Sequence, residues 1–201
     1  MISTYQSILT FSIAAIALLA SPGPATLALA ASGAAYGMRK SLKFYAGVIS
    51  GLTIAVFVVA TGLYVIIKNF EFLGIILMGI SIIYMIYLAY GIATASPIRD
   101  EQATPSPGLG AGFTLGITNV KAYVAFAALL GSFTLDIAPS WEQGIKALIC
   151  ILVCIGSDFC WLLAGSKLRV LFVHPVWSRV LNISFATLMI ATVAWSLTRL
   201  E

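Results

Sequence analysis

The sequence predicts an all-α, polytopic membrane protein with six transmembrane helices. Of its 201 residues, 61% are hydrophobic and only 9% are charged, whereas a soluble domain carries about 25% charged residues. A soluble fold of this length would need more polar side chains to cover its core. The bilayer is therefore the solvent that this chain requires, and apolar runs of about 20 residues mark the helices that cross it.

Six apolar runs are long enough to be these helices. The first has no basic residue before its apolar core, and the run continues past Ala20, so we interpret it as a retained helix rather than a signal peptide. Lys121 interrupts the fourth run, Lys146 lies at the outer edge of the fifth, and Asp158 lies inside the fifth. The six runs are Met1–Met38, Phe44–Ile67, Phe72–Ile98, Ala111–Phe133, Ile145–Ser166 and Val180–Thr198.

A polar linker divides the chain, which we expect to form a single membrane domain over residues 1–201. Residues 95–110 are rich in proline, serine, glycine and charge, which favours irregular structure. The linker separates a first half, residues 1–94, from a second half, residues 111–201, with three helices in each. Because three is odd, the second half starts on the opposite side of the membrane. This arrangement predicts a 3+3 inverted-topology repeat, although the weak internal similarity does not establish it alone.

The basic residues predict the orientation of these helices. We interpret the net charge of +4 as an indicator of membrane orientation rather than of nucleic-acid binding. Two sets of basic residues lie in connections on opposite sides of the membrane. The larger set is Arg39, Lys40, Lys43, Arg99, Lys167, Arg169 and Arg179, and the smaller is Lys68, Lys146 and Arg199. By the positive-inside rule the larger set is cytoplasmic. We therefore expect a multi-pass membrane protein with a cytoplasmic linker and both termini extracytoplasmic.

The first helix contains two prolines around a glycine, in the order Ser21, Pro22, Gly23, Pro24. Each proline removes a backbone donor and clashes with the preceding turn. We predict that the helix breaks at Pro22-Gly23-Pro24 and that a half-helix begins near Ala25. The free N–H groups at the start of that half-helix would favour an anion. The alternative is a simple proline kink without a ligand.

Two charged residues lie inside predicted spans, where a charge is costly unless it is paired, hydrated or protonated. Asp158 is the only acidic residue deep in a span, and Lys121 lies near the middle of the fourth. An ion pair between them is geometrically possible. Asn119 offers hydrogen bonds at the same depth as Lys121. The alternatives are a hydrogen-bonded structural carboxyl for Asp158 and a snorkelling side chain for Lys121.

Glycine pairs four residues apart predict that several helices pack closely. Small residues let two helix backbones approach each other inside a membrane. The pairs are Gly33/Gly37, Gly47/Gly51, Gly108/Gly112 and Gly112/Gly116.

Enzyme and metal motifs are absent from the sequence. No convergent nucleophile, acid and base can be assembled from one membrane aspartate and one loop histidine. Cys150 and Cys154 share a helix face but have no histidine or carboxylate in the same turns, which disfavours a metal site. We therefore expect no enzymatic activity, no cofactor and no metal.

Three motifs together resemble the LysE/RhtB family of amino-acid exporters. The first is Pro22-Gly23-Pro24, the second is Gly112-Phe113 leading to Asn119-Val120-Lys121, and the third lies within Asp158–Ala164. The resemblance extends over essentially the whole chain. The second motif of the family has a proline where this chain has Val120, so the continuity of the fourth helix stays open. Some members also carry an aspartate in helix 2, near the position of Leu52 in this chain.

The resemblance implies secondary active export of amino acids or related small metabolites across the bacterial cytoplasmic (inner) membrane, driven by an ion gradient with a proton as the coupling ion. The expected partners are the small-molecule substrate, the coupling ion and the lipid bilayer, and a homo-oligomer is left open. A metal-ion exporter of the same broad superfamily and a non-transporting structural membrane protein are the alternatives. A channel is less consistent with the sequence, which shows no charged ring or carbonyl filter.

The buried polar groups form the expected transport site. A zwitterionic amino acid presents a carboxylate, suited to Lys121 and the half-helix N-terminus, and an ammonium, suited to Asp158. Asp158 is also the candidate to carry the coupling proton. The predicted substrate-binding residues are Ser21, Pro22, Gly23, Pro24, Ala25, Asn119, Lys121 and Asp158.

Overall fold

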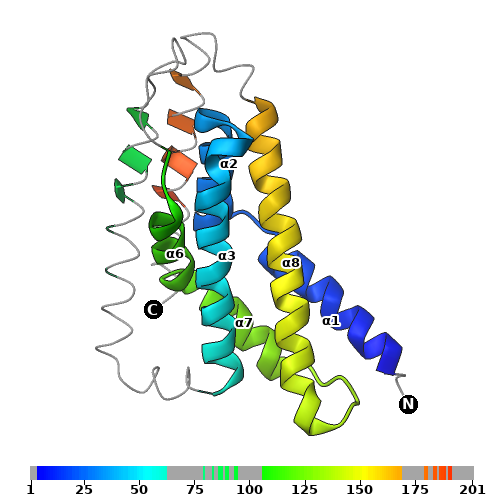
Figure 1. The fold of residues 1–201 in the computed structure, drawn as a ribbon. Helices are drawn as coiled ribbons and strands as arrows, with labels where there is room; N and C mark the ends of the chain where they lie inside the picture. Colours follow the sequence, from blue (N-terminus) through cyan, green and yellow to red (C-terminus); the bar gives the residue numbers. More distant parts are fainter. Residues whose placement is uncertain are drawn as a thin grey trace.

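A computed structural model describes residues 4–62 and 106–168, together with single residues and short stretches between 79 and 94 and between 179 and 191. The described elements are α-helices without a strand among them, which agrees with the predicted all-α class. In Figure 1, α2, α3 and α8 run side by side while α1 diverges from them. In chain order the helices are α1 (Thr4–Leu19), α2 (Pro24–Tyr36), α3 (Met38–Ala60), α6 (Leu109–Ile117), α7 (Val120–Ser132) and α8 (Pro139–Leu168).

Two of these helices are long and apolar enough to cross a membrane by themselves. They are α3, with 23 residues, and α8, with 30 residues. The pairs α1 with α2 and α6 with α7 also qualify, each as one bent span, with bends of 62° and 51°. Most of the predicted spans Phe72–Ile98 and Val180–Thr198, and most of linker 95–110, lie outside the described residues. The six-helix count and the 3+3 repeat therefore stay predictions.

The first predicted span is broken between α1 and α2, as the prolines predict. Pro24 occupies the first turn of α2, where the missing N–H of a proline costs no helical hydrogen bond. Gly23 precedes it as the N-cap residue. Its N–H donates to the Thr26 hydroxyl at 2.8 Å, and that hydroxyl donates to the Gly23 carbonyl at 3.0 Å. The predicted break at Pro22-Gly23-Pro24 is confirmed.

The fourth predicted span is also broken, between α6 and α7, although Val120 replaces a proline there. Asn119 is the N-cap residue of α7, and its side-chain oxygen accepts a hydrogen bond from the Ala122 N–H at 3.3 Å. Asparagine is among the residues most favoured at this position. The asparagine cap therefore begins a new helix without help from a proline, which answers the question that the sequence left open.

The helix that contains Asp158 begins earlier than predicted, at Pro139 instead of Ile145. Its first turns hold an ion pair between Lys146 Nζ and Glu142 Oε1 at 2.7 Å. Lys146 is only 2% exposed and also donates to the carbonyls of Leu130 and Phe133. It therefore clamps the C-terminal end of α7 onto α8, a contact that its predicted position at the outer edge of the span does not reveal.

Glycines bring the helices into backbone contact at two interfaces. Between α3 and α6, a Cβ on Gly51 would lie 2.6 Å from the Ile117 nitrogen, and one on Gly112 would lie 2.8 Å from the Val48 nitrogen. The packing role predicted for these glycines is confirmed. Gly33 of α2 and Gly165 of α8 make the second interface in the same way, against the backbones of Leu162 and Ala30.

Two glycines of the predicted pairs have other surroundings. Gly37 lies between α2 and α3 with φ of 80°, a left-handed conformation that glycine adopts without a steric penalty. A Cβ on Gly108 would meet nothing within 4 Å. The prediction of close packing is therefore wrong for Gly108, because that residue precedes α6 instead of lying on its packed face.

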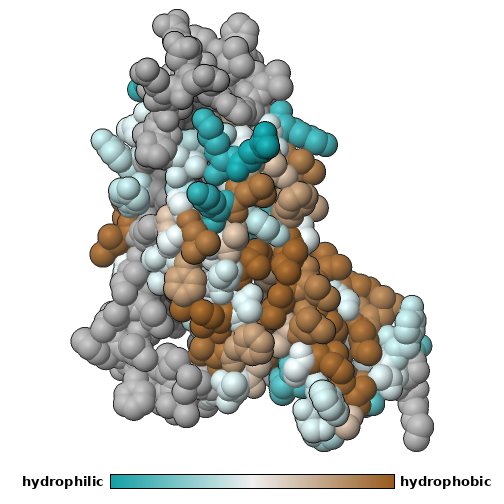
Figure 2. Space-filling model, viewed as in Figure 1, coloured by the Kyte–Doolittle hydropathy of each residue, from teal (hydrophilic) through white to brown (hydrophobic). Residues whose placement is uncertain are grey.

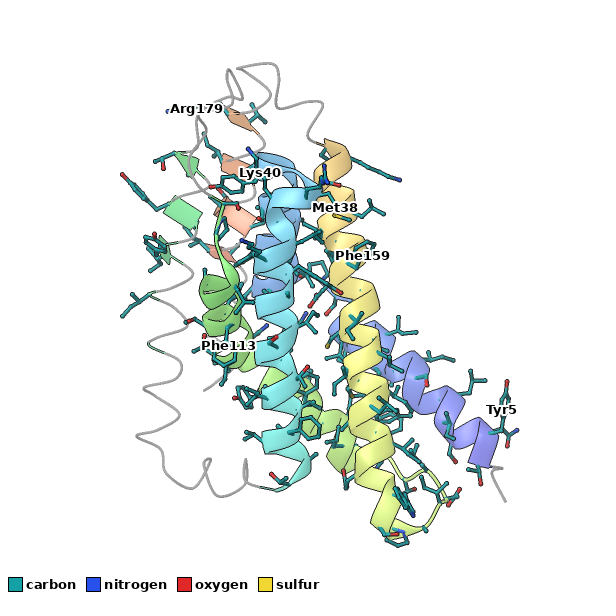
Figure 3. All side chains as sticks on the ribbon, viewed as in Figure 1. Tyr5, Met38, Lys40, Phe113, Phe159 and Arg179 are labelled. Atoms are coloured by element: carbon teal, nitrogen blue, oxygen red, sulfur yellow. The ribbon has the colours of Figure 1, made fainter. Side chains whose placement is uncertain are left out.

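The surface matches a protein that lies in a bilayer. In Figure 2, hydrophobic residues cover α1 and the neighbouring part of α8, and hydrophilic residues gather at the end where α2 meets α3. Lys40 lies at that end and Tyr5 lies at the far end of α1 (Figure 3). Large exposed apolar side chains such as Ile13, Leu148 and Leu152 are 60%, 54% and 58% exposed, which is the surface that lipid chains would cover.

Candidate functional site

A small pocket lies where the two helix breaks meet. Its volume is about 30 Å³, which is room for one or two water molecules and too little for an amino acid. The structure brings five of the eight predicted site residues to its wall: Gly23, Ala25, Asn119, Lys121 and Asp158. The rest of the wall is apolar or weakly polar and consists of Leu18, Leu19, Thr26, Leu52, Ala122, Ala125 and Cys154.

Lys121 reaches across the pocket to the end of α1. Its ammonium donates to the Ser21 carbonyl at 2.6 Å, to the Ser21 hydroxyl at 2.8 Å and to the Pro22 carbonyl at 3.2 Å. The last carbonyls of a helix have no partner inside it, and an ammonium has three donors. Lys121 therefore holds the first helix break, and it does so instead of snorkelling to a membrane surface.

The ion pair between Lys121 and Asp158 does not form in this structure. Among the described residues, the ion pair is that of Lys146 with Glu142. The Lys121 ammonium has three oxygen acceptors from Ser21 and Pro22 instead. The two predicted charges thus share one pocket without neutralising each other directly.

Asp158 is buried and incompletely partnered. It is 3% exposed, and its Oδ2 atom has no hydrogen-bond partner in the part of the chain that the structure describes. The neighbouring Ser157 hydroxyl donates to the Cys154 carbonyl at 3.4 Å rather than to this carboxylate. An unpartnered buried carboxylate is costly. Its placement in the pocket wall is what a cation-binding or proton-binding group would show.

The start of α2 supplies the complementary charge. Ala25 and Thr26 line the pocket, and the first N–H groups of a helix have no partner inside it. Gly23, the N-cap residue, has no side chain with which to cap them. These N–H groups and the helix dipole favour an anion. Pro24 does not line the pocket, but it starts the helix that places these groups there.

Asn119 lines the pocket and also caps its own helix. Its side chain caps its own helix by accepting from Ala122, and the residue is 5% exposed. It therefore fixes the start of α7 and with it the direction of Lys121. We assign it as a positioning residue in this structure.

Several contacts at the site were not evident from the sequence. The Trp161 indole Nε1 donates to the Ala20 carbonyl at 3.0 Å, so it holds the end of α1 together with Lys121. Leu52 and Cys154 contribute side chains to the pocket from α3 and α8. Cys154 precedes Asp158 by one helical turn, a spacing that places both on one helix face. This spacing is the one feature of the sequence that could have predicted Cys154 as a pocket residue.

Comparison with known proteins places this site in a family. The family model described as "LysE type translocator" matches residues 16–199. The "Cysteine/O-acetylserine efflux protein" of Salmonella choleraesuis (strain SC-B67) is 30% identical over 172 residues, which are 84% of this chain and 86% of that protein. Proteins with the same name from Escherichia coli O1:K1 / APEC and Klebsiella pneumoniae subsp. pneumoniae are 29% and 27% identical, again over 84% of this chain and 86% of each relative.

No solved structure gives a significant match. The names of the family and of the relatives describe translocators and efflux proteins rather than enzymes. The family model covers most of the chain and includes both helix breaks and Asp158. By this match, the chain belongs to the LysE type translocator family.

Proposed function

We propose that this protein is a secondary active transporter that exports small zwitterionic amino acids across the bacterial cytoplasmic membrane in exchange for protons. The observation that carries this proposal is the pocket itself. A buried, unpartnered carboxylate oxygen and the first residues of α2, a helix whose N-cap is a glycine, line the same small space. A zwitterion is the simplest ligand that satisfies both.

In the proposed complex, the helix breaks have moved apart so that the pocket, which is about 30 Å³ here, admits the substrate. The substrate carboxylate then lies at the N–H groups of Ala25 and Thr26, and its ammonium pairs with Asp158. Charge-assisted hydrogen bonds of this kind are about twice as strong as neutral ones. The carboxylate also competes with Ser21 and Pro22 for the Lys121 ammonium. Substrate binding would therefore loosen the contact that holds α1 to α7, which couples occupancy of the site to movement of the helix break.

The composition of the pocket wall supports a small substrate with an uncharged side chain. Beyond Lys121 and Asp158, the described wall contains no charged group, so a charged substrate side chain would be buried without a partner. The relatives named for cysteine and O-acetylserine efflux agree with this selectivity. We propose substrates of that size and polarity.

Asp158 also explains the proposed coupling. When the substrate leaves, its ammonium no longer neutralises the carboxylate, and a buried unpaired charge opposes closure of the empty site. A proton from the outside restores neutrality and allows the empty protein to return. Outward movement of substrate would then be exchanged for inward movement of a proton.

We also propose the orientation that the basic residues predict, with both termini extracytoplasmic. The exposed residues Arg39, Lys40 and Lys43 lie in the first turns of α3, and Lys167 lies in the last turn of α8. The contact of Gly33 with the Ser166 backbone places these two segments at the same end. Basic residues that are separate in sequence thus share one end, which supports the assignment of that end to the cytoplasm.

Transport into inverted membrane vesicles tests the proposal. Vesicles with the wild-type protein should accumulate labelled cysteine or O-acetylserine when they are acidified inside, and should not accumulate divalent metal ions. The Asp158→Asn variant should lose this accumulation. The Asp136→Asn variant is the matched control, because it makes the same change in an exposed loop. Normal transport by well-expressed Asp158→Asn protein, or metal uptake instead of amino-acid uptake, would refute the proposal.

A further inference from the structure

The end of α1 is held by two side chains of different chemistry. Trp161 of α8 donates from its indole Nε1 to the Ala20 carbonyl at 3.0 Å, and Lys121 of α7 donates to the next two residues, Ser21 and Pro22. Lys121 lines the pocket, where a substrate carboxylate would compete for its ammonium. Trp161 lines a separate groove between α1 and α8. Its neutral N–H therefore lies outside the space in which the substrate would bind.

We propose that Trp161 is a positioning residue for transport, which holds Ala20 as the pivot about which α1 swings once Lys121 releases Ser21 and Pro22. Hinges of this kind are a few residues at the end of an element that absorb the change in backbone direction. The swing moves α1 away from α7 and toward the groove, and so widens the pocket between α1 and α7. This inference rests on the proposed function, because the substrate is what draws Lys121 away.

The groove gives α1 space for this movement. Its volume is about 800 Å³, and no described segment of the chain fills it. On the α8 side, a Cβ on Gly156 would meet nothing within 4 Å. In Figure 1, α1 diverges from α8. The residues of α1 that line the groove share one helix face and are Ser12, Ile16 and Ala20. Leu18 and Leu19 of the same helix line the pocket instead, so α1 is the wall between a closed pocket and an open groove.

The two half-helices of this span are attached to the protein in different ways. Helix α2 contacts α8 through backbone atoms, because a Cβ on Gly33 would lie 2.9 Å from the Ser166 nitrogen. Helix α1 contains no glycine, and side chains attach its far end to the segment after α7. The Phe11 and Phe133 rings meet edge to face at 5.6 Å, and the Ser7 hydroxyl donates to Asp136 Oδ2 at 3.2 Å. Such side-chain contacts can separate one at a time, so α1 is the moving part of the span and α2 the fixed part.

Transport kinetics of labelled cysteine in inverted vesicles test the role of Trp161. Trp161→Phe keeps an aromatic ring and removes the N–H donor. Without the pivot, the released α1 reaches positions from which the site does not close again, so kcat should fall about fivefold, the equivalent of one neutral hydrogen bond. KM should hardly change, because Trp161 does not touch the substrate, whereas Lys121→Met should mainly raise KM. Trp141→Phe is the matched control at a 70% exposed position of the same helix. An unchanged kcat, or a rise in KM like that of Lys121→Met, would overturn the inference.

Distances between spin labels in the purified protein test the swing without transport. Labels on Tyr5→Cys and Ser132→Cys, at two exposed positions, report the separation of α1 from the end of α7, and Cys160→Ser removes an exposed native thiol. Lys121→Met, which removes the three contacts of the lysine, should add a second, longer distance. Adding Trp161→Phe should replace that second distance with a broad distribution.

One unchanged distance in the labelled parent and both variants would overturn the swing. A sharp second distance that survives Trp161→Phe would overturn the pivot. Absence of amino-acid transport in the wild type would instead refute the proposed function, and the label distances would still decide between a pivoting and a fixed α1.

Discussion

Replacing Lys121 with methionine removes the ammonium that bridges the two helix breaks and keeps most of the length of the side chain. Three acceptors, the Ser21 carbonyl and hydroxyl and the Pro22 carbonyl, then lose a charged donor at 2.6, 2.8 and 3.2 Å. The proposed substrate carboxylate loses the same partner. We therefore expect effects on both stability and transport.

The size of both effects follows from these hydrogen bonds. A hydrogen bond to a charged group contributes about 1.5–3 kcal/mol when it is buried, but Lys121 is partly exposed and water can replace part of the loss. We expect the loss of the three Lys121 hydrogen bonds to lower the free energy of unfolding by about 2 kcal/mol. This corresponds to a decrease in Tm of roughly 4–8 °C for a protein of this size. Loss of one charged contact to the substrate should raise KM about 10- to 100-fold.

Thermal unfolding of the purified protein in detergent measures the first effect, and transport kinetics in inverted vesicles measure the second. Lys40→Met is the control, because it removes the same charge from an exposed position at the end of the molecule. It should change neither Tm nor KM by a comparable amount. A Lys121→Met variant with wild-type Tm and KM would refute both the bridging role and the substrate-binding role of this lysine.

Two further predictions concern packing and the α7–α8 clamp. Gly112→Ala should destabilise the protein by about 1–3 kcal/mol or prevent its accumulation, because the added methyl group meets backbone atoms of α3. Gly108→Ala is the control and should be nearly neutral, because a Cβ there meets nothing within 4 Å. Equal thermal stability of the two variants would contradict the packing argument. Lys146→Met should lower thermal stability more than Glu142→Gln, because the lysine also donates to the carbonyls of Leu130 and Phe133. If the changes in unfolding free energy were additive in a double-mutant cycle, Lys146 and Glu142 would not be coupled.

The two helix breaks show which local features a sequence can reveal. The two prolines around Gly23 remove backbone donors and clash with the preceding turn, which disfavours a continuous helix. The first break could therefore be predicted from residue types alone. The second break has no proline and depends on the cap that Asn119 makes with Ala122. Asparagine caps many helices but also occurs inside them, so its presence did not decide between a break and a continuous helix.

The contacts of Lys121 and Lys146 show why the rest of the site could not be predicted. Lys121 binds Ser21, which is 100 residues away in the sequence, and no local pattern reports such a contact. Lys146 lies four residues after Glu142, a spacing that permits an ion pair on a helix surface. Its burial depends on carbonyls at the end of α7, which the sequence does not place. In both cases residue type and depth were visible in the sequence, but the partner was not.

The described parts of the two halves repeat one plan, which supports the proposed inverted repeat. In each, a bent pair of half-helices precedes a long helix: α1 and α2 before α3, and α6 and α7 before α8. The halves do not pack equivalently, however. In the pair α1 and α2, the glycine contact with the long helix α8 is made by α2, the later half-helix. In the pair α6 and α7, the close contact with the long helix α3 is made by α6, the earlier half-helix. In an inverted repeat these two interfaces lie at the same end of the molecule. We therefore expect that opening the pocket toward the α2–α3 turn requires both glycine interfaces to separate.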